Sequence, residues 1–354
     1  MNVLERLLNE ESPYSLSKNE KQQLLNKEIA NLTSFHKENC QLYANIIKSF
    51  NSDGDTPVPL PVRLFKLHKL QSISEQDTFK VLTSSGTTSQ VVSQIILDKE
   101  TAGLQTKVLI KIMQSYLGKQ RLPMLIIDHP NVIKNRKSFS ARGAGILGLS
   151  NFGRDHTYAL TENMELDLDV VNSFLERHKG KPKFVFGFTF MVWKYFIQEL
   201  VNNNVKLDFS ETTLIHSGGW KKLIDEAVDN QTFKNITREY AGIRNIHNFY
   251  GMVEQVGSIF VECEHGYLHS PNFANVKIID PVNFTEKGVK EAGVIQVESI
   301  IPRSYPGHIL LTEDTGTVFG EDDCMCGRKG KYFLVHGRLP KAEVRGCSDT
   351  HEKT

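Results

Sequence analysis

The chain has 354 residues, of which 40% are hydrophobic and 9% aromatic, enough for a large core in one big domain or two. Lysine and arginine (42) balance aspartate and glutamate (41), so the net charge of +1 predicts no attraction to nucleic acid or to an anionic membrane. The N-terminus does not resemble a signal peptide, and no apolar run approaches about 18 residues, so we expect a soluble cytoplasmic protein without integral membrane association. Five cysteines in a chain of this length do not predict a disulfide scaffold.

The first fifty residues are predicted to be helical. Ser17 and Glu20 have the spacing of a capping box. Apolar residues then recur at helical spacing, namely Leu25, Ile29, Leu32, Tyr43, Ile46 and Phe50. Three prolines between residues 57 and 61 indicate a turn-rich link to the rest of the chain.

The middle of the chain alternates between predicted helices and strands. Helices are expected near 99–117, 167–178, 189–202 and up to about 236, and strands at 122–128, 183–186 and 212–216. Residues 141–153 are rich in small side chains, which could line an apolar pocket or allow close packing. After residue 245 short strands follow, at 257–262, 276–279, 294–298, 308–312 and 331–335. This order predicts an α/β fold with a mostly parallel sheet flanked by helices and a smaller β-rich part.

Residues 78–90 begin as a short strand, in which Phe79 and Val81 alternate with polar neighbours. Hydroxyl residues then surround Gly86; they are Thr78, Thr83, Ser84, Ser85, Thr87 and Thr88. A loop of this kind exposes backbone N–H and side-chain O–H groups that could bind phosphate oxygens. It lacks the Gly-Lys-Ser/Thr ending of a Walker A loop, and alone it also fits a solvated turn.

Two further stretches accompany this loop, Asn-Phe-Tyr-Gly-Met-Val-Glu-Gln at 248–255 and Leu-Leu-Thr-Glu-Asp-Thr-Gly at 310–316. Together the three resemble the adenylate-forming superfamily of acyl and aryl ligases. The resemblance implies the fold of that superfamily, with an ATP-binding set of Ser84, Ser85, Gly86, Thr87, Thr88, Gly218, Gly219, Trp220, Tyr250, Gly251, Asp314 and Arg338. It also implies that Tyr250 lies against the adenine, Asp314 binds the ribose and Glu254 holds Mg²⁺. Val253 stands where the family has a threonine.

The C-terminal sequence narrows the resemblance. Where the superfamily continues into a second domain, which brings a catalytic lysine, residues 339–354 form a short polar tail with one cysteine, Cys347. With Ser-Tyr-Pro-Gly-His at 304–308 and Gly-Arg-Leu-Pro at 337–340, this ending resembles the acyl-protein synthetases of bacterial luciferase operons. We therefore expect an N-terminal helical segment (1–60), an adenylating domain (61–336, β-rich from about 257) and a hinge remnant with a flexible tail (337–354).

This family resemblance implies a reaction. Those proteins activate a fatty acid with ATP, transfer the acyl group to their own C-terminal cysteine and pass it to a fatty-acid reductase that makes the aldehyde. Cys347 would be the nucleophile, and nearby Arg345 would favour its thiolate. The alternative is an incidental cysteine in a polar tail. The aromatic run at 184–190 could form one wall of the acyl pocket or simply belong to the core.

Four other residues suggest a metal site. Cys324 and Cys326 form a Cys-x-Cys turn, and Cys263 and His269 lie upstream, with His265 as an alternative ligand. Three thiolates and one imidazole fit a closed, structural zinc site, and related phenylacetate-CoA ligase-like proteins carry a similar set. The alternative is a group of packed free thiols.

The expected function is that of an ATP-dependent fatty acid–protein ligase. One rival is a ligase of the same superfamily that transfers acyl groups to CoA or a carrier protein; another is a non-catalytic nucleotide-binding partner of the reductase. The acyl chain length, the pathway (bioluminescence or another) and the assembly state, homo- or hetero-oligomer, stay open. Lys341 or the partner protein could substitute for the missing lysine-bearing domain.

Overall fold

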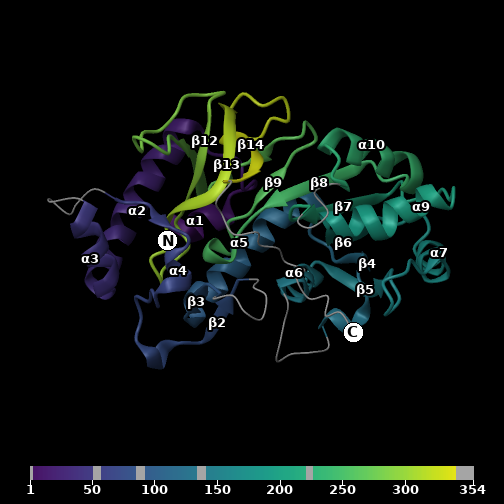
Figure 1. The fold of residues 1–354 in the computed structure, drawn as a ribbon, viewed down its shortest axis with the longest axis horizontal. Coiled ribbons are helices and arrows are strands. Elements are labelled where there is room, and N and C mark those ends of the chain that lie inside the picture. Colours follow the sequence, from purple (N-terminus) through teal and green to yellow (C-terminus); the bar gives the residue numbers. More distant parts are fainter. Residues whose placement is uncertain (1–2, 51–56, 85–91, 134–140, 221–225, 340–354) are drawn as a thin grey trace. The chain divides into compact units, whose positions relative to one another are not determined.

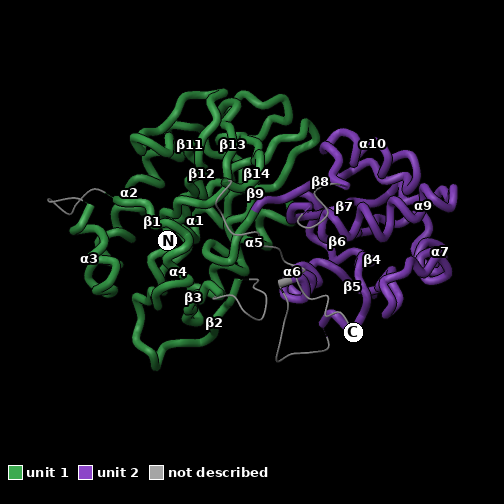
Figure 2. Tube along the Cα trace, in the orientation of Figure 1, with its two compact units in different colours: residues 1–84, 89–115, 251–343 green, residues 85–88, 116–250, 344–354 purple. Residues whose placement is uncertain are grey.

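The computed structural model describes residues 3–50, 57–84, 92–133, 141–220 and 226–339 (Figure 1). The chain divides into two compact units (Figure 2). Unit 1 comprises residues 1–84, 89–115 and 251–343, and unit 2 comprises residues 85–88, 116–250 and 344–354. The domain boundaries expected at residues 60 and 336 stay predictions.

Unit 2 contains a parallel sheet. Its strands lie in the order β8 (Asn245–Tyr250), β7 (Thr212–Ser217), β6 (Lys183–Phe188), β4 (Leu122–Ile126) and β5 (Gly153–Tyr158). Each neighbouring pair is parallel, and every residue of the central strand β6 is buried. A strand buried on both faces needs the near-continuous apolar sequence that β6 has.

Helices connect these strands. They are α6 (Ala141–Ser150), α7 (Leu168–Arg177), α8 (Thr189–Val192), α9 (Gln198–Asn202) and α10 (Asn230–Ala241), with the short η2 (Pro130–Ile133) and one π-helical turn, η3 (Trp193–Ile197). Asp167 and Asp229 begin α7 and α10 by accepting a hydrogen bond from a backbone N–H of the first turn. Gly242 ends α10 in the left-handed conformation, at φ 73°.

Unit 1 contains an antiparallel sheet. Its strands lie in the order β11 (Ala274–Ile279), β12 (Ala292–Ser299), β13 (Ile309–Glu321), β14 (Lys331–Arg338), β10 (Leu268–His269) and β9 (Phe260–Glu262). The short strand β1 (Leu60–Pro61) pairs with β13 in parallel. A separate hairpin joins β2 (Lys80–Thr83) to β3 (Gln94–Leu97). The structure thus has the parallel and antiparallel parts that the sequence predicts.

The helices of unit 1 come mainly from its N-terminal part. They are α1 (Val3–Asn9), α2 (Lys18–Asn39), α3 (Gln41–Phe50), α4 (Leu64–Leu67) and α5 (Lys99–Leu117), with the single turns η1 (Glu75–Asp77) and η5 (Val253–Gln255). The predicted capping box is present, because the backbone N–H of Ser17 donates to the Glu20 carboxylate at 3.0 Å. Among the described helices, none is both long and apolar enough to cross a membrane.

Several local predictions were wrong. Phe50 is 69% exposed, and Ile47 is the buried residue of the last turns of α3. The short strand predicted near residue 79 is present as β2, but Phe79 and Val81 are 56% and 47% exposed and do not form a buried face. The last helix of unit 2 begins at Asn230 and ends at Ala241, five residues beyond the predicted end near 236.

Candidate active site and metal centre

In unit 2, two predicted nucleotide-binding segments follow neighbouring parallel strands. Gly218 follows β7 at φ 85°, and Tyr250 is the last residue of β8. Ser217 pairs with Phe249 in register, and the Ser217 hydroxyl donates to the Phe249 carbonyl at 2.9 Å. Ligands of α/β sheets bind beyond the carboxyl ends of the strands. The structure therefore brings the Gly218–Trp220 segment and Tyr250 to one edge of the sheet, where such ligands bind.

The aromatic run of β6 packs behind this edge. Phe184 and Phe186 are fully buried in the core, and Phe188 lies beside Gly145 and Gly218. A Cβ at Gly145 would approach the Phe188 ring to 2.9 Å, and one at Gly218 to 3.3 Å. Small residues on α6 thus permit close packing, which was one of the two predicted roles of residues 141–153. The acyl-pocket role of the aromatic run stays a prediction.

One buried ion pair of unit 2 was not predicted. Asp128, just beyond β4, lies 3.0 Å from the Arg142 guanidinium of α6, and both side chains are buried. Burial raises the pKa of Asp128 to about 6, although the arginine charge opposes the shift. The sequence signal was weak, because an Asp after a buried strand and an Arg among small residues do not reveal that they meet.

In unit 1, Glu254 occupies a turn that is fixed from several sides. Its side chain is only 4% exposed, and the Tyr305 hydroxyl donates to its backbone carbonyl at 2.9 Å. The Gln255 amide donates to the Gly307 carbonyl at 2.8 Å. Gly257, at φ 93°, fits against α5 so closely that a Cβ would lie 2.8 Å from the Cα of Gln105. The predicted magnesium ligand is therefore held by a rigid backbone.

The hydroxyl-rich loop lies between the two strands of the β2–β3 hairpin. Ser84 begins it: the Ser84 hydroxyl accepts from the backbone N–H of Ser93 at 2.8 Å, and the Ser84 N–H donates to the Ser93 carbonyl at 3.1 Å. Ser85, Gly86, Thr87 and Thr88 lie outside the described residues, as does Cys347. The described part shows a closed hairpin base for the predicted phosphate loop.

The predicted ribose ligand and the hinge residue lie opposite each other. Asp314 of β13 and Arg338 of β14 are register partners, and the Arg338 Nε lies 3.7 Å from the Asp314 carboxylate. Asp314 lies within the strand β13, which continues well past the predicted end at 312. The Thr312 hydroxyl accepts from the Asp314 N–H at 3.1 Å and so fixes the local backbone.

The four predicted zinc ligands form one cluster in unit 1. The ligand atoms of Cys263, His269, Cys324 and Cys326 all lie within 4.8 Å of one another. The Sγ atoms of Cys263 and Cys324 are 4.0 Å apart, and the Cys326 Sγ is 3.3 Å from the His269 Nε2. Ligands at the usual Zn–S and Zn–N distances of a tetrahedron are separated by roughly 3.5–3.8 Å. The donor set therefore fits a tetrahedral metal ion, and the exposed alternative, His265, is not part of it.

Two tight turns supply these ligands. Cys263 leads from β9 into a turn closed by its carbonyl and the Gly266 N–H at 3.0 Å, and β10 then brings in His269. Cys324 and Cys326 lie in the β13–β14 connection, where the Gly327 N–H donates to the Cys324 carbonyl at 3.0 Å. Because β10 pairs with both β9 and β14, the two turns meet at one end of the sheet.

The cluster is enclosed by the N-terminal part of the chain. Lys21 of α2 is buried and donates to the carbonyl and hydroxyl of Ser270, the residue after His269. Burial lowers the pKa of Lys21 to about 7 and that of His269 to about 4, and it raises the pKa of Cys324 to about 12. Without a cation, His269 and Cys324 are therefore neutral near pH 7. Cys326, the least buried one, borders a groove of about 450 Å³.

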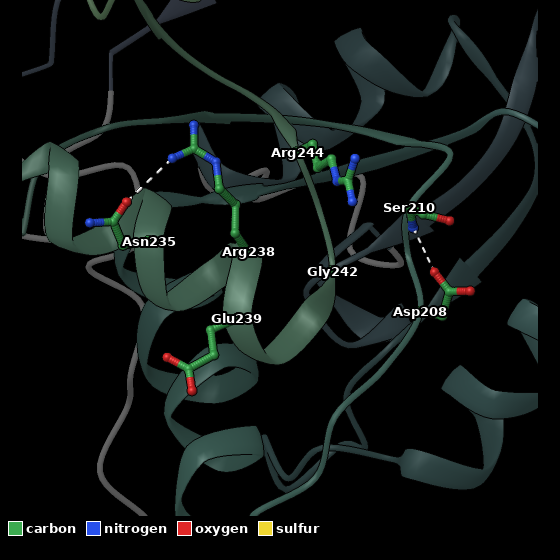
Figure 3. Close-up of a pocket in the computed structure, with 7 residues that line it drawn as sticks. All are labelled: Asp208, Ser210, Asn235, Arg238, Glu239, Gly242 and Arg244. Atoms are coloured by element: carbon green, nitrogen blue, oxygen red, sulfur yellow. Dashed lines mark hydrogen bonds between the residues drawn. The ribbon is translucent and has the colours of Figure 1, made fainter.

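A second groove, of about 740 Å³, lies on unit 2 around the end of α10 (Figure 3). Its lining carries charges of both signs. The lining residues are Asp208, Ser210, Asn235, Arg238, Glu239, Gly242 and Arg244. The Asn235 amide oxygen accepts from Arg238 at 3.3 Å, and the Asp208 carboxylate accepts from the Ser210 N–H at 3.0 Å. None of the predicted nucleotide or metal ligands lines it.

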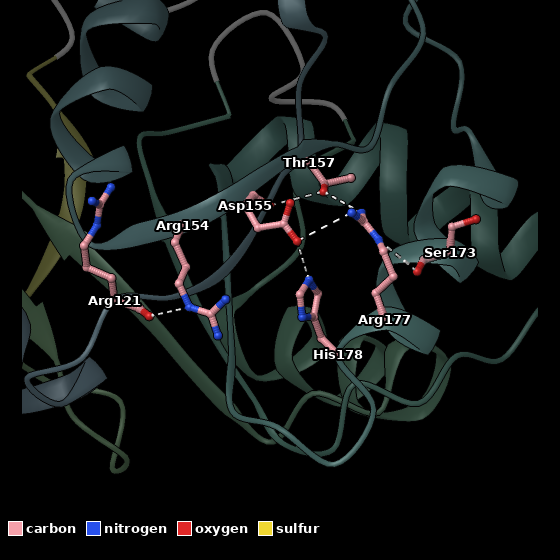
Figure 4. A network of polar contacts seen from close by, with 7 residues as sticks. All are labelled: Arg121, Arg154, Asp155, Thr157, Ser173, Arg177 and His178. Carbon is pink, nitrogen blue, oxygen red and sulfur yellow. Dashed lines mark hydrogen bonds and ion pairs between the residues drawn. The ribbon is translucent and has the colours of Figure 1, made fainter.

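A polar network ties the edge strand β5 to α7 (Figure 4). The Asp155 carboxylate lies 2.7 Å from the Nε2 of His178 and 3.5 Å from Arg177, whose guanidinium also donates to Thr157. Asp155 has a φ of 49°, which side chains other than Asn and Asp rarely adopt. This conformation aims its carboxylate at the end of α7, so the network has a structural explanation.

Comparison with known proteins identifies the family. Residues 2–354 match the acyl-protein synthetase family, LuxE. The chain belongs to this family. Two relatives, each named as a long-chain-fatty-acid–luciferin-component ligase, are 22% identical to this acyl-protein synthetase. The one from Aliivibrio fischeri matches over 328 residues, covering 86% of this chain and 82% of its own. The one from Vibrio harveyi matches over 363 residues, covering 95% and 89%.

Solved structures confirm the predicted fold of this acyl-protein synthetase. An open conformation of 2-hydroxyisobutyryl-CoA ligase, in complex with 2-HIB-AMP and CoA, has a TM-score of 0.68 at 14% identity and covers 93% of this chain and 77% of that one. The amide bond synthetase McbA from Marinactinospora thermotolerans has a TM-score of 0.50 at 16% identity and covers 77% and 52%. Fold and family together confirm the expected enzyme class, an AMP-forming ligase.

Proposed function

We propose that this acyl-protein synthetase activates a long-chain fatty acid with ATP in the cytoplasm and acylates its own Cys347. The fatty-acid carboxylate attacks the α-phosphorus of ATP, pyrophosphate leaves, and an acyl-adenylate results. The Cys347 thiolate then attacks the acyl carbonyl, and AMP leaves. A thiol of a fatty-acid reductase then attacks the thioester, the Cys347 thiol leaves, and the reductase forms the aldehyde with a hydride donor that it binds.

The proposal assigns roles to residues at both described edges. In it, Gly218, Gly219, Trp220 and Tyr250 bind the adenine, and Asp314 binds the ribose with Arg338 opposite it. Ser84, Ser85, Gly86, Thr87 and Thr88 bind the phosphates, and Gly251, next to Tyr250, belongs to the same ATP-binding set. Hydrogen bonds from Tyr305 and Gln255 fix the turn that carries Glu254. This supports its proposed role as a magnesium ligand, because a metal ligand must keep its position during adenylyl transfer.

Two metal ions belong to the proposal. Glu254 would hold Mg²⁺, which fits a single buried carboxylate because Mg²⁺ in such sites takes most of its remaining ligands from substrate phosphates and water. When bound, Mg²⁺ neutralises charge on the triphosphate. Cys263, His269, Cys324 and Cys326 would hold a structural Zn²⁺, since four donors at tetrahedral spacing leave no open position for a substrate.

One observation carries the proposal: the match to acyl-protein synthetases extends over residues 2–354, so it includes the tail with Cys347. A ligase that acylates CoA or a carrier protein is the first rival, supported by the fold of 2-hydroxyisobutyryl-CoA ligase. A self-acylating thiol would be redundant in that rival. The second rival is a non-catalytic partner of the reductase, and such a protein would not need a metal ligand held in a fixed position at Glu254.

Intact-protein mass spectrometry tests the proposal. The full chain is incubated with ATP, Mg²⁺ and a mixture of fatty acids, and we expect a covalent acyl adduct that hydroxylamine releases and peptide mapping places on Cys347. The mass of the adduct identifies the preferred chain length. C347S should lose the adduct and keep acid-dependent ATP–pyrophosphate exchange, whereas the matched variant C40S should keep both.

Three other outcomes would contradict it. AMP formation without an adduct would show that the acceptor thiol is on another molecule. Undiminished turnover of C347S onto CoA would favour the CoA-ligase rival. A chain that catalyses no ATP–pyrophosphate exchange with any fatty acid would favour the non-catalytic rival.

A further inference from the structure

The loop between β12 and β13 contacts several elements of unit 1 at once. Its Ser304 donates through its hydroxyl to the Ile96 carbonyl of β3 at 2.8 Å, and through its N–H to the Thr101 hydroxyl of α5 at 3.2 Å. The Ser304 carbonyl accepts from the Ser72 N–H at 2.8 Å. All of these groups are buried, so Ser304 fixes the loop to the returning strand of the β2–β3 hairpin.

The next residue of the same loop reaches the turn that carries Glu254. Tyr305 is fully buried, its ring packs edge-on against Phe65, and its hydroxyl donates to the Glu254 carbonyl at 2.9 Å. Gly307 leaves no room beside this contact, because a Cβ there would lie 2.2 Å from the Tyr305 ring and 2.9 Å from the Glu254 carbonyl oxygen. The Gln255 side-chain amide also joins the turn to this loop, because it donates to the Gly307 carbonyl.

Two parts of the proposed catalytic machinery are therefore joined by adjacent residues of one loop. The β2–β3 hairpin carries the predicted phosphate loop, and the Glu254 turn carries the predicted magnesium ligand. In the proposed reaction both bind the same triphosphate, and adenylyl transfer is sensitive to small displacements of such groups. A link of two residues, Ser304 and Tyr305, would keep the spacing between strand β3 and the Glu254 turn constant.

We propose that Tyr305 is a positioning residue for Glu254, and that Ser304 couples this position to the phosphate hairpin. The inference rests on the proposed function, since it deepens the role given there to Glu254. A purely structural Tyr305 would stabilise the fold and would leave the response of the enzyme to magnesium unchanged.

The test compares two conservative variants of the full chain. Y305F removes the hydroxyl that holds Glu254 and keeps the ring. Y43F is the matched control, because Tyr43 is equally buried but its hydroxyl faces the His308 side chain at 3.3 Å. For each variant, acid-dependent ATP–pyrophosphate exchange is measured against Mg²⁺ concentration, and thermal unfolding is measured in parallel.

We expect Y305F to raise the Mg²⁺ concentration for half-maximal exchange about three- to tenfold and to lower kcat about tenfold, the size expected for one lost hydrogen bond acting on a reacting group. Y43F should stay within about twofold of the unmodified chain at a similar loss of thermal stability. Equal magnesium responses of Y305F and Y43F would overturn the inference while leaving the proposed function intact. Absence of exchange in the unmodified chain would overturn both.

S304A provides an independent second variant, which decides the question if Y305F does not fold. It removes only the hydroxyl bond to Ile96 and keeps the backbone contacts of the loop. We expect a smaller shift of the magnesium response in the same direction, about two- to threefold, together with a raised KM for ATP. A magnesium response and a KM for ATP equal to those of the unmodified chain would contradict the coupling.

Discussion

A buried histidine pair gives the fold a defined acid sensitivity. His36 of α2 and His308 stack with ring centroids 4.9 Å apart, beside Tyr43 and Arg303. The His36 Nε2 lies 3.2 Å from the Pro302 carbonyl and therefore carries the proton, and its Nδ1 accepts from Ser72 at 2.8 Å. Burial lowers the pKa of His36 from its ordinary 6.5 to about 4, although the carbonyl contact opposes the shift.

The direction of the effect on stability follows from proton binding. A histidine whose pKa is lower in the folded state binds fewer protons when folded, so acid favours the unfolded chain. His36 contributes almost nothing to the pH dependence of stability above about pH 7.5, and its destabilising effect grows as the pH falls through 6.5 to about 4. Two and a half pKa units at about 1.4 kcal/mol each give a loss of about 3 kcal/mol of unfolding free energy.

H36Q tests this magnitude, because glutamine can donate to Pro302 without titrating. Urea unfolding, followed by circular dichroism at pH values from 7 down to 4, gives the unfolding free energy of each chain. We expect H36Q to be less stable than the unmodified chain at pH 7 and to lose up to about 3 kcal/mol less on acidification. H68Q, at an exposed histidine, should keep the full pH dependence. The same pH dependence in H36Q as in the unmodified chain would refute the shifted pKa.

Three further predictions concern the metal cluster, the β5 network and a close backbone contact. C324S should abolish zinc binding, measured by elemental analysis of the purified chain, and lower the melting temperature by roughly 5 °C or more, whereas C40S should keep the metal; metal retention in C324S would exclude the cluster. D155A should cost about 2 kcal/mol in denaturant unfolding, because it adds left-handed strain to the lost contact with His178, and D155N should cost less than about 1 kcal/mol; equal losses would show that the backbone conformation is unimportant. G257A should destabilise the chain by more than about 2 kcal/mol, since its Cβ meets the α5 backbone, while G103A on α5 should be neutral or stabilising by up to about 1 kcal/mol; similar values for both would contradict the close contact.

The sequence predicted elements best where one physical signal dominated. The apolar spacing of residues 99–117 matches α5 to the residue, and the apolar run from 183 is the fully buried strand β6. Strand β5, Gly-Arg-Asp-His-Thr-Tyr, gave no such signal because it is an edge strand with polar side chains in solvent. The glycines of α6 oppose helix formation locally, and Gly145 is needed for another reason, because a larger residue there would clash with the Phe188 ring.

The residues of the candidate site likewise divide into those with a local sequence signal and those without one. The Cys and His ligands could be found from the sequence because a Cys-x-Cys turn and a Cys–His hairpin are local patterns, each with few alternative uses. Tyr305 could not, because its hydroxyl contacts a backbone carbonyl fifty-one positions away, and a carbonyl has no residue type to recognise. The ion pair between Asp128 and Arg142 could not be predicted for a related reason, since only the packing of α6 on the sheet brings the two residues together.

The position of the metal cluster suggests why a structural metal would matter to Asp314 and Arg338, two residues of the proposed nucleotide site in the same unit. The connection that holds Cys324 and Cys326 closes the β13–β14 hairpin, and the far end of that hairpin places Asp314 opposite Arg338. Two register shifts lie between these ends, and a slip of one residue would turn Arg338 to the other face of the sheet. His269 ties the neighbouring strand β10 to the same cluster, in register with Tyr332 of β14. A bound metal would hold the closed end of the hairpin in one register and, through it, keep Asp314, the proposed ribose ligand, opposite Arg338.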